Sequence, residues 1–508
     1  MFWTSRGNIK LFLTASLALH IVILTALFFP SEKAHDLLGD DAWSKLLEYG
    51  VSKTNCGVDK TIYEQHALAV QQGSTCGICQ FDPELCEELG ADNVQRALSY
   101  VGTNARLRRV LAKLRRGERL TVGVIGGSVS RGFGIDREPG YTPNTPTNLN
   151  RIVFDRLNSL FPAPNGVKVG ESGRKENMNS YISGAVGGVG TDYFSLCYGE
   201  HLPDDMDLVL IELAINDEVL IRNINSYELL VRSLLDLPNA PAIMNLQVFA
   251  LNFNTITNGG DMHLGIAQFY DLPVISLRNA AYRSVLQNES LIPEYFFVSE
   301  KGEIDTRHIS RKGHNLMGRL GAAYIETQLC EMDKFVASIP GADSMTIDQL
   351  YPLEPIPRMQ VNMRYDKDVV IPTIKPQCFP ANGKKNPLVP VTNEGWRNWN
   401  WKEKHYLISD TPGSRVTFNL TTAIGNIEIH YLRSYQYNLG SAKCWIDEDV
   451  DKAVRLDGYW KEHYNIGRAA TIGSNLTPGE HKLTCELLNE TADPSGGKEF
   501  RLISVMSI

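Results

Sequence analysis

The sequence has no excess of positive charge. Its 508 residues include 50 Lys and Arg against 58 Asp and Glu, which gives a formal net charge of -8. No stripe of Lys and Arg with interleaved aromatic residues stands out, and nucleic-acid-binding surfaces depend on such stripes. We therefore expect no nucleic-acid partner. Internal repeats and low-complexity tracts are absent as well, and the hydrophobic content of 43% is ordinary for globular protein.

The signatures of several nucleotide and metal sites are also missing. There is no G-x-x-x-x-G-K-[ST] phosphate loop, and the glycine-rich stretch at 183–194 does not make G-x-G-x-x-G. The residues around Ser128 do not form the G-x-S-x-G nucleophile elbow. Cys76 and Cys79 form a C-x-x-C, the spacing of a zinc site, but their setting favours disulfides, as discussed below. We expect neither a cofactor nor a metal.

A long apolar run lies near the N-terminus, at residues 11–30. About 20 apolar residues are enough to span a bilayer as a helix. Arg6 and Lys10 precede the run and acidic residues follow it, so the positive-inside rule keeps residues 1–10 in the cytosol. We expect a single-pass type II membrane protein of the Golgi or cell surface, with its body in the lumen or outside. The alternative is a cleaved signal peptide and a secreted protein.

Sequons and cysteines suit that compartment. Four N-x-[ST] sequons are present, at Asn288, Asn419, Asn475 and Asn489. Four of the nine cysteines cluster after the apolar run: Cys56, Cys76, Cys79 and Cys86. In an oxidising lumen they favour disulfides over zinc, and Cys444 and Cys485 could pair with each other. The odd total leaves at least one cysteine free or intermolecular, and the connectivity stays open.

Changes of pattern divide the rest of the chain into four parts. Residues 31–117 contain two segments with helical spacing and are predicted to form a luminal stem. Over residues 118–335, apolar strand-like runs alternate with helical patterns, which indicates a parallel sheet covered by helices on both faces. Residues 336–384 are rich in proline and read as a surface linker. Short strands separated by turns fill residues 385–508 and predict an all-β sandwich, or jelly roll.

Polar residues follow the predicted strands of the α/β part. Ser128 comes after two glycines at the end of "VGVI", where the edge of an open sheet binds ligands. The loop at 183–194 offers backbone N–H groups to an anion, as a phosphate-binding loop also would. Asn216 follows the buried run "DLVLIELAI", so its amide could donate to a developing oxyanion. Its neighbour Asp217 is assigned to capping a helix N-terminus.

An Asp and a His lie three residues apart near the end of the same part. His308 could accept a proton from a serine, and Asp305 could orient the imidazole and stabilise its charged form. His314 opens the last predicted helix, and we expect it to pack or cap there.

The order of these pieces resembles the SGNH (GDSL-like) hydrolase superfamily over residues 118–335. The resemblance implies a flavodoxin-like three-layer α/β/α fold and a catalytic triad of Ser128, His308 and Asp305. The N–H of Ser128, the N–H of Gly188 and the side chain of Asn216 would form the oxyanion hole. The sequence departs from the usual blocks because it has Gly-Gly-Ser in place of Gly-Asp-Ser, Ser183 where Asn is usual, and Ala214 where Gly is usual. The general pattern is similar to fungal and algal membrane-anchored, capsule-associated-like members.

This reading predicts a serine esterase that removes acyl groups, above all acetyl, from a carbohydrate or glycoconjugate. The β part is rich in aromatic side chains, which stack on sugar rings as readily as they fill a core. Deleting residues 385–508 is expected to weaken polymer binding while sparing small-ester turnover. Two alternatives remain: an O-acyltransferase using the same triad, and a glycan-binding protein on an inactive hydrolase fold. The sequence leaves the oligomeric state open.

Overall fold

The computed structural model describes residues 76–135, 145–163, 177–402 and 404–508. The predicted membrane segment at 11–30 and Cys56 lie outside these ranges. Within them, no helix is both long enough and apolar enough to cross a bilayer.

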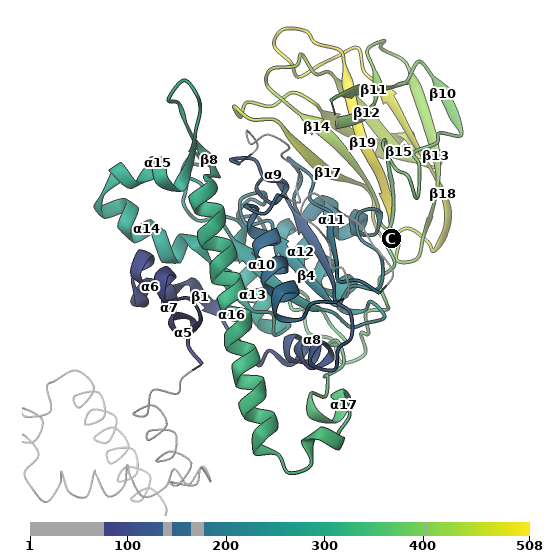
Figure 1. Ribbon diagram of the computed structural model, residues 1–508. Coiled ribbons are helices and arrows are strands. Elements are labelled where there is room, and N and C mark those ends of the chain that lie inside the picture. The colour runs from purple at the N-terminus through teal and green to yellow at the C-terminus, as the bar shows by residue number, and fades with distance from the viewer. Residues whose placement is uncertain (1–75, 136–144, 164–176, 403) are drawn as a thin grey trace, which may run out of the picture. The chain divides into compact units, whose positions relative to one another are not determined.

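A six-stranded sheet forms the centre of the α/β domain (Figure 1), in the order β1-β6-β5-β4-β2-β3. Its strands are β1 (Leu98–Tyr100), β2 (Thr121–Gly126), β3 (Ser180–Ser183), β4 (Leu208–Glu212), β5 (Ala242–Gln247) and β6 (Val274–Ser276). Strands β2 to β6 are parallel, while β1 adds an antiparallel edge. All residues of β2, β4 and β5 are buried, as their continuous apolar runs predicted. The order of the parallel strands is the flavodoxin-like one that we expected.

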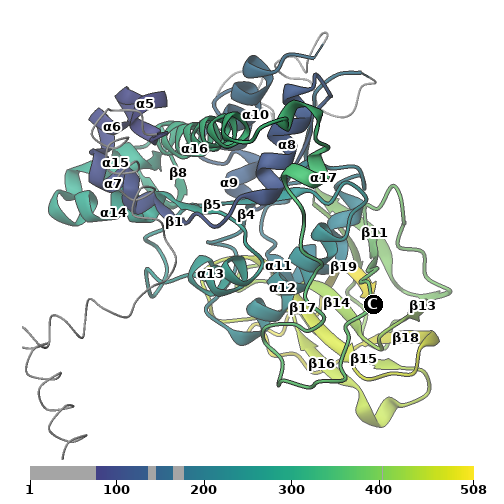
Figure 2. The ribbon, with the colours of Figure 1, turned by 90° about the horizontal axis from the view of Figure 1, so that it is seen from below.

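Helices cover both faces of this sheet (Figure 2). One face carries α8 (Ala105–Arg115), α10 (Leu149–Leu160), α14 (Leu277–Gln287) and α16 (Arg311–Ser338), and the other carries α11 (Thr191–Cys197), α12 (Ile221–Leu235) and α13 (Gly259–Phe269). Each layer buries its apolar side chains in a separate cluster against the sheet. The shorter helices are α5 (Ile78–Phe81), α6 (Pro83–Leu89), α7 (Ala91–Ala97), α9 (Ser128–Arg131), α15 (Ile292–Tyr295) and α17 (Ile347–Leu350). The 3₁₀ turns are at Tyr198–Glu200, Glu289–Leu291, Ala342–Ser344 and Val450–Lys452.

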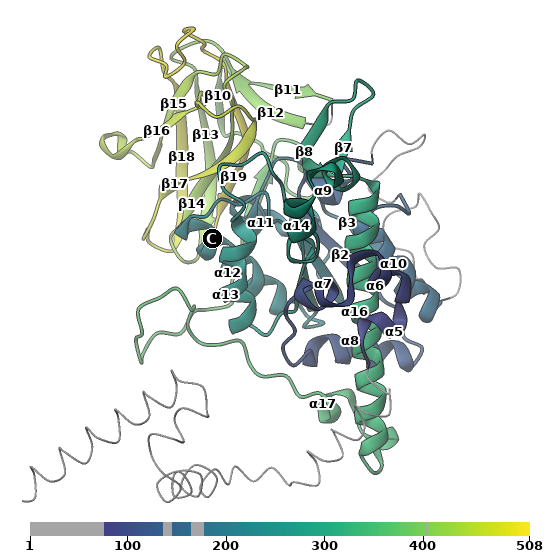
Figure 3. The ribbon, with the colours of Figure 1, turned by 90° about the vertical axis from the view of Figure 1, so that its left-hand side faces the viewer.

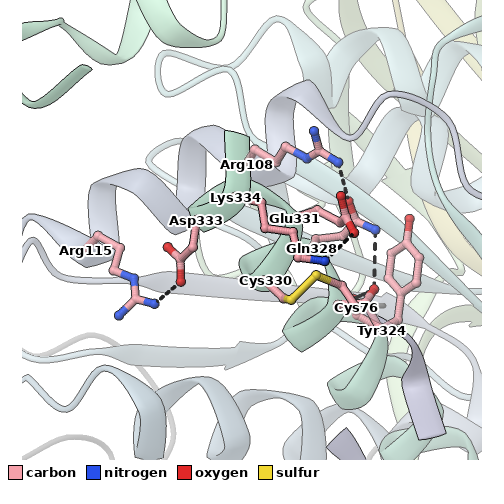
Figure 4. The surroundings of a disulfide bond; sticks show 10 residues. Cys76, Arg108, Arg115, Tyr324, Gln328, Cys330, Glu331, Asp333 and Lys334 are labelled. Carbon is pink, nitrogen blue, oxygen red and sulfur yellow. Dashed lines mark hydrogen bonds and ion pairs between the residues drawn. A yellow bond between two sulfur atoms is a disulfide. The ribbon is translucent and has the colours of Figure 1, made fainter. Parts of the chain in front are cut away.

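The described part of the predicted stem belongs to the α/β domain. Helices α5 to α8 contribute buried residues to the same apolar cluster as α10 and α16, and β1 pairs with β6. A disulfide joins Cys76 to Cys330 on α16, and beside it Arg115 pairs with Asp333 at 2.5 Å (Figure 4). Residues 76–117 therefore pack as part of the α/β domain, whose start the sequence pattern placed at residue 118.

Two antiparallel sheets form the C-terminal β sandwich. The first has the order β10-β13-β18-β15-β16, and the second has β11-β12-β19-β14-β17, with β9 added beside β19. The strands are β9 (Gln377–Pro380), β10 (Thr392–Glu394), β11 (Arg397–Trp401), β12 (Lys404–Ser409), β13 (Arg415–Thr422), β14 (Ile427–Arg433), β15 (Ser441–Ile446), β16 (Val454–Asp457), β17 (Ile466–Gly473), β18 (Gly479–Leu487) and β19 (Phe500–Ser507). A disulfide between Cys444 and Cys485 crosses from β15 to β18, which confirms the predicted pair.

The sandwich packs on the α11 face of the α/β domain (Figure 3), and residues 76–508 form one compact unit. Met506 and Ile508 lie in the same apolar cluster as α11 and α12. The predicted linker at 336–384 takes part in this contact, because β9 lies within it and Cys378 is bonded to Cys197 at the end of α11. The remaining bond, Cys79–Cys86, is local.

Replacing both Cys197 and Cys378 by serine is expected to lower the free energy of unfolding. The bond closes a chain segment of 181 residues, and closing a long loop removes much conformational entropy from the unfolded chain. We expect a loss of about 2–4 kcal/mol in denaturant melts without reductant. The matched control replaces Cys79 and Cys86, which are 7 residues apart, and should cost less. Equal losses for the two pairs would contradict a role for this bond in holding the domains together.

Candidate active site

Ser128 is the first residue of α9, directly after β2. The turn needs both preceding glycines, since a Cβ on Gly126 would lie 2.1 Å from Ser130 Oγ and one on Gly127 would lie 2.2 Å from Asn216 Oδ1. The Gly127 N–H donates to the Glu212 carbonyl at 3.2 Å, which ties the turn to the end of β4. The serine is thereby presented at the carboxyl edge of the sheet, as the sequence predicted.

His308 and Asp305 lie on β8 (Ile304–Ile309), which forms a small hairpin with β7 (Phe296–Val298). The hydroxyl oxygen of Ser128 is 2.9 Å from His308 Nε2, and His308 Nδ1 is 2.6 Å from Asp305 Oδ2. The Phe133 ring lies beside the imidazole, with centroids 5.4 Å apart. The structure thus joins the three predicted residues in one hydrogen-bonded chain.

The charge on Asp305 settles the direction of this chain. Burial raises the pKa of Asp305, but the hydrogen bond and charge of His308 and the backbone N–H groups of Arg307 and His308 lower it by more. The net pKa of Asp305 is below its usual value, so the carboxyl is ionised at neutral pH. An ionised carboxylate only accepts, so His308 carries a proton on Nδ1. In the neutral form of the ring, Nε2 then accepts from the Ser128 hydroxyl.

Gly188 and Asn216 border the same space as Ser128. Gly188 has a φ of 83°, which favours glycine, and a Cβ there would meet nothing within 4 Å. The Asn216 amide lies against Gly127, and no described residue accepts a hydrogen bond from it. Of the neighbouring glycines, Gly187 also faces the space, whereas a Cβ on Gly190 would lie 2.2 Å from Asp217 Oδ1.

Asp217 and His314 lie near the site, and their side chains are used in hydrogen bonds that hold neighbouring helices. Asp217 does cap a helix, but it caps α11 and not the helix that follows it, because it accepts from the N–H and the hydroxyl of Thr191 at 2.9 and 2.6 Å. It also binds His263 at 2.7 Å in a buried pair. His314 is fully buried in α16, and its Nδ1 accepts from the Leu149 N–H at 3.3 Å, so it packs as predicted. Burial lowers the pKa of His314 to about 4.

A pocket of about 1170 Å³ opens over Ser128 and is walled by both domains. The β sandwich contributes several of the aromatic residues that the sequence singled out: Trp401, Tyr459, Trp460 and Tyr464. Others, including Trp396, Tyr431 and Trp445, are buried in the sandwich. Some of the aromatic residues of the sandwich therefore line the pocket, and others fill the core of the sandwich. No group of His, Cys, Asp and Glu among the described residues could hold a metal ion.

Three consecutive residues of β17 hold the loops that carry Gly188 and Asn216. The Gly467 N–H donates to the Gly188 carbonyl at 3.0 Å. Arg468, which is 4% exposed, pairs with Glu218, two residues after Asn216. The Ala469 N–H donates to Asp192 Oδ2 at 3.2 Å, in the first turn of α11. No sequence signal marked these residues, because they act only through the packing of one domain on the other.

Glu212 lies at the end of β4, beneath the turn that carries Ser128. Its Oε2 accepts from both the N–H and the hydroxyl of Ser130 at 3.2 Å, while its Oε1 is buried without a described partner. Burial raises the pKa of Glu212 to about 8, against the opposing effect of the Ser130 hydrogen bonds. The carboxyl is therefore protonated at neutral pH, and the turn rests on an uncharged group.

The raised pKa of Glu212 predicts a pH dependence of stability. In the unfolded chain the Glu212 carboxyl loses its proton near pH 4.5, whereas in the folded protein it keeps this proton up to about pH 8. The resulting stabilisation is complete below about pH 4.5 and is lost as the pH rises to about 8. Glu212→Gln, which cannot ionise, is expected to flatten the fall in unfolding free energy across these pH values. Denaturant melts at several pH values test this, and equal slopes for the two proteins would contradict it.

Comparisons with known proteins support the fold. No family model and no curated protein matches the chain. Among solved structures, a two-domain esterase active on acetylated mannans, co-crystallized with mannopentaose, matches with a TM-score of 0.58 and 22% identity. The match covers 82% of this chain and 97% of that one. A further crystal structure of a two-domain esterase active on acetylated mannans matches with a TM-score of 0.55 and 20% identity, over 82% and 98% of the two chains. The chain thus has the two-domain fold of those esterases, a mainly parallel α/β domain followed by a β sandwich.

Proposed function

We propose that this protein is a serine esterase of the SGNH type that removes O-acyl groups, above all acetyl, from a carbohydrate. The observation that carries the proposal is the hydrogen-bonded chain from Ser128 through His308 to the ionised Asp305, at the floor of a pocket with room for several sugar units. A serine is a weak nucleophile unless a base takes its proton, and this arrangement supplies one.

The reaction follows from these positions. As the Ser128 oxygen attacks the ester carbonyl, its proton passes to His308 Nε2, and Asp305 stabilises the imidazolium that forms. The carbonyl oxygen becomes an oxyanion, and the N–H groups of Ser128 and Gly188 and the Asn216 amide are its proposed donors. The intermediate collapses with cleavage of its bond to the sugar oxygen, which takes the proton from His308 and leaves as a hydroxyl. Water then attacks the acyl-serine by the same route and releases the carboxylic acid.

Several features favour a carbohydrate over a small free ester. The pocket spans two domains and is far larger than an acetyl group needs. Trp401, with 49% of its surface exposed, lines this pocket, as do Tyr459 and Tyr464, and aromatic faces stack on the C–H faces of sugar rings. The structures that share this fold are described as active on acetylated mannans. A sugar hydroxyl in place of water would make the same site an O-acyltransferase, and this remains the second candidate.

We also propose a luminal or extracellular position for the folded part. Eight cysteines pair in four disulfides, which an oxidising compartment maintains. The four sequon asparagines, Asn288, Asn419, Asn475 and Asn489, are all exposed and open to glycosylation.

Substituting the proposed nucleophile tests the reaction. Ser128→Ala is expected to reduce release of acetate from an aryl acetate and from acetylated mannan by at least about 10³-fold, because no acyl-enzyme can form. Acetate release by the purified protein is the measurement, and Ser338→Ala, at the exposed end of α16, is the matched control. Equal rates for wild type and Ser128→Ala would refute the proposed role of the serine. A second assay adds a sugar acceptor to the reaction. Acylated sugar would indicate a transferase, and free acetate alone would indicate an esterase.

Arg468 is proposed to position the oxyanion donors through Glu218 and β17. Arg468→Met is expected to lower kcat on a small aryl acetate about tenfold, with little change in KM, because displaced donors weaken only the transition state. Arg468→Lys, which keeps the charge beside Glu218, should recover part of the loss. Thr471→Val, on the same strand but exposed, is the control and should leave kcat unchanged. An unaltered kcat in Arg468→Met would contradict this positioning.

The contacts of β17 also revise the expectation for deleting residues 385–508. That deletion removes Gly467, Arg468 and Ala469 together with the sandwich. Turnover of small esters is therefore expected to fall along with polymer binding.

A further inference from the structure

One wall of the pocket combines two guanidinium groups with three aromatic rings, and residues of both domains contribute to it. Arg307, next to His308, lies over Phe253 and Tyr464, at 5.7 and 5.1 Å from the ring centroids. The Tyr464 ring packs edge to face against the Trp460 ring, with the ring centroids 4.7 Å apart. Arg433 lies over Trp460 at 5.2 Å. All five residues line the pocket.

The two arginines of this wall lack a carboxylate partner among the described residues, since no ion pair includes either of them. With the Asn252 amide turned to accept, its oxygen receives Arg307 Nε and Nη2 at 3.1 and 2.8 Å, and no described residue accepts a hydrogen bond from Nη1. Arg433 Nε is buried with no described hydrogen-bond partner. Other enclosed arginines carry ion pairs, among them Arg468 with Glu218 and Arg278 with Asp261. Both side chains are half-buried, and the carboxylate of Asp305, whose charge acts on Arg307, is already bound by His308. A partly desolvated guanidinium without an ion-pair partner is costly, so Arg307 and Arg433 are prepared for a ligand.

The charge balance of the whole pocket points the same way. Four acidic residues line the pocket among the described residues. Glu218 and Asp457 are paired with arginines, Arg468 and Arg455 respectively, and Asp217 is engaged by His263 and Thr191. Basic residues are in excess along the walls, and include Lys402, Lys404, Arg433 and Lys461 beside Arg307. Burial lowers the pKa of Lys404, as does the positive charge of Arg131, so cations are crowded there. The pocket is thus positive although the chain carries a net charge of -8.

We infer that this wall binds carboxylates, and that the glycan in the pocket is acidic, with uronic acid units. The inference rests on the proposed function for the ester that is cleaved, and adds the class of polymer that carries it. A guanidinium stacked on a ring keeps its N–H edge free, and that edge matches both oxygens of a carboxylate. Exposed aromatic surface elsewhere in the pocket, above all that of Trp401, serves the sugar rings, so charge and stacking recognise different parts of the polymer. A positive pocket also attracts an acidic polymer from a distance.

Binding measured without turnover tests this directly. The ligands are an oligogalacturonate and the same oligomer as its methyl ester, which keeps the sugar rings and removes the charge. Calorimetric titration of the full protein carrying Ser128→Ala, at low ionic strength, should show at least about tenfold tighter binding of the charged oligomer. Salt at about 0.5 M should reduce this difference, because it screens partly exposed charges. Equal affinity for the two oligomers, or no binding of either, would overturn the inference.

Variants locate the effect. Arg307→Gln and Arg433→Gln are each expected to weaken binding of the charged oligomer about tenfold, and to reduce its advantage over the methyl ester. Lys452→Gln removes the same charge from an exposed site outside the pocket, where the side chain is 84% accessible, and should change neither affinity. If Lys452→Gln weakens binding as much as the two arginine variants do, general charge attraction explains the preference and the proposed wall is wrong.

Turnover separates this inference from the proposed esterase activity. Acetylated forms of the two oligomers are given to the wild-type protein, and acetate is measured. A higher kcat/KM on the charged form supports both proposals. Equal kcat/KM on the two forms overturns the acidic-glycan inference and leaves the esterase intact. If no acetate is released from any substrate, the esterase proposal fails, while the calorimetric comparison still decides whether the wall binds carboxylates.

Discussion

The docking of strand β17 on the α/β domain is the contact on which the rest of the site depends. The Gly467 N–H holds the Gly188 carbonyl, and Arg468 holds Glu218 beside Asn216. Both proposed donor loops are thus tied to the sandwich, and Cys197–Cys378 makes the same contact covalent. The β sandwich is part of the pocket wall and of the support beneath the proposed oxyanion hole, so the two domains work as one unit.

Much of the hydrogen-bonded chain could be predicted from the sequence, because strands impose simple rules. Residues that follow parallel strands meet at one edge of the sheet, and this rule alone predicts that Ser128 and Asn216 lie close together. An Asp and a His three residues apart on one segment reach the same site, and His308 does bridge Asp305 and Ser128. The buried runs of β2 and β4 likewise made the sheet predictable.

Other features depend on contacts between distant segments and left no local pattern. Asp217 reads as a cap for the helix after it, yet it caps α11, which precedes it in the chain. Residues 76–117 have the helical spacing of a stem, but their apolar faces are buried against α16. The partners of Cys76 and Cys197 lie 254 and 181 residues away, at distances over which spacing carries no information. The arginine and aromatic wall arises for the same reason, since Arg307 and Arg433 come from different domains.

The central claim is that an acyl group passes through Ser128. The most direct measurement is to quench the protein during reaction with an aryl acetate at mildly acidic pH, where deacylation is slowed, and to map the acetyl group by peptide mass spectrometry. The account predicts one acetyl group on the peptide that contains Ser128, which disappears in Ser128→Ala and decays as water is allowed to react. Turnover with no acetyl on this peptide, or with a stable acetyl elsewhere, would contradict it.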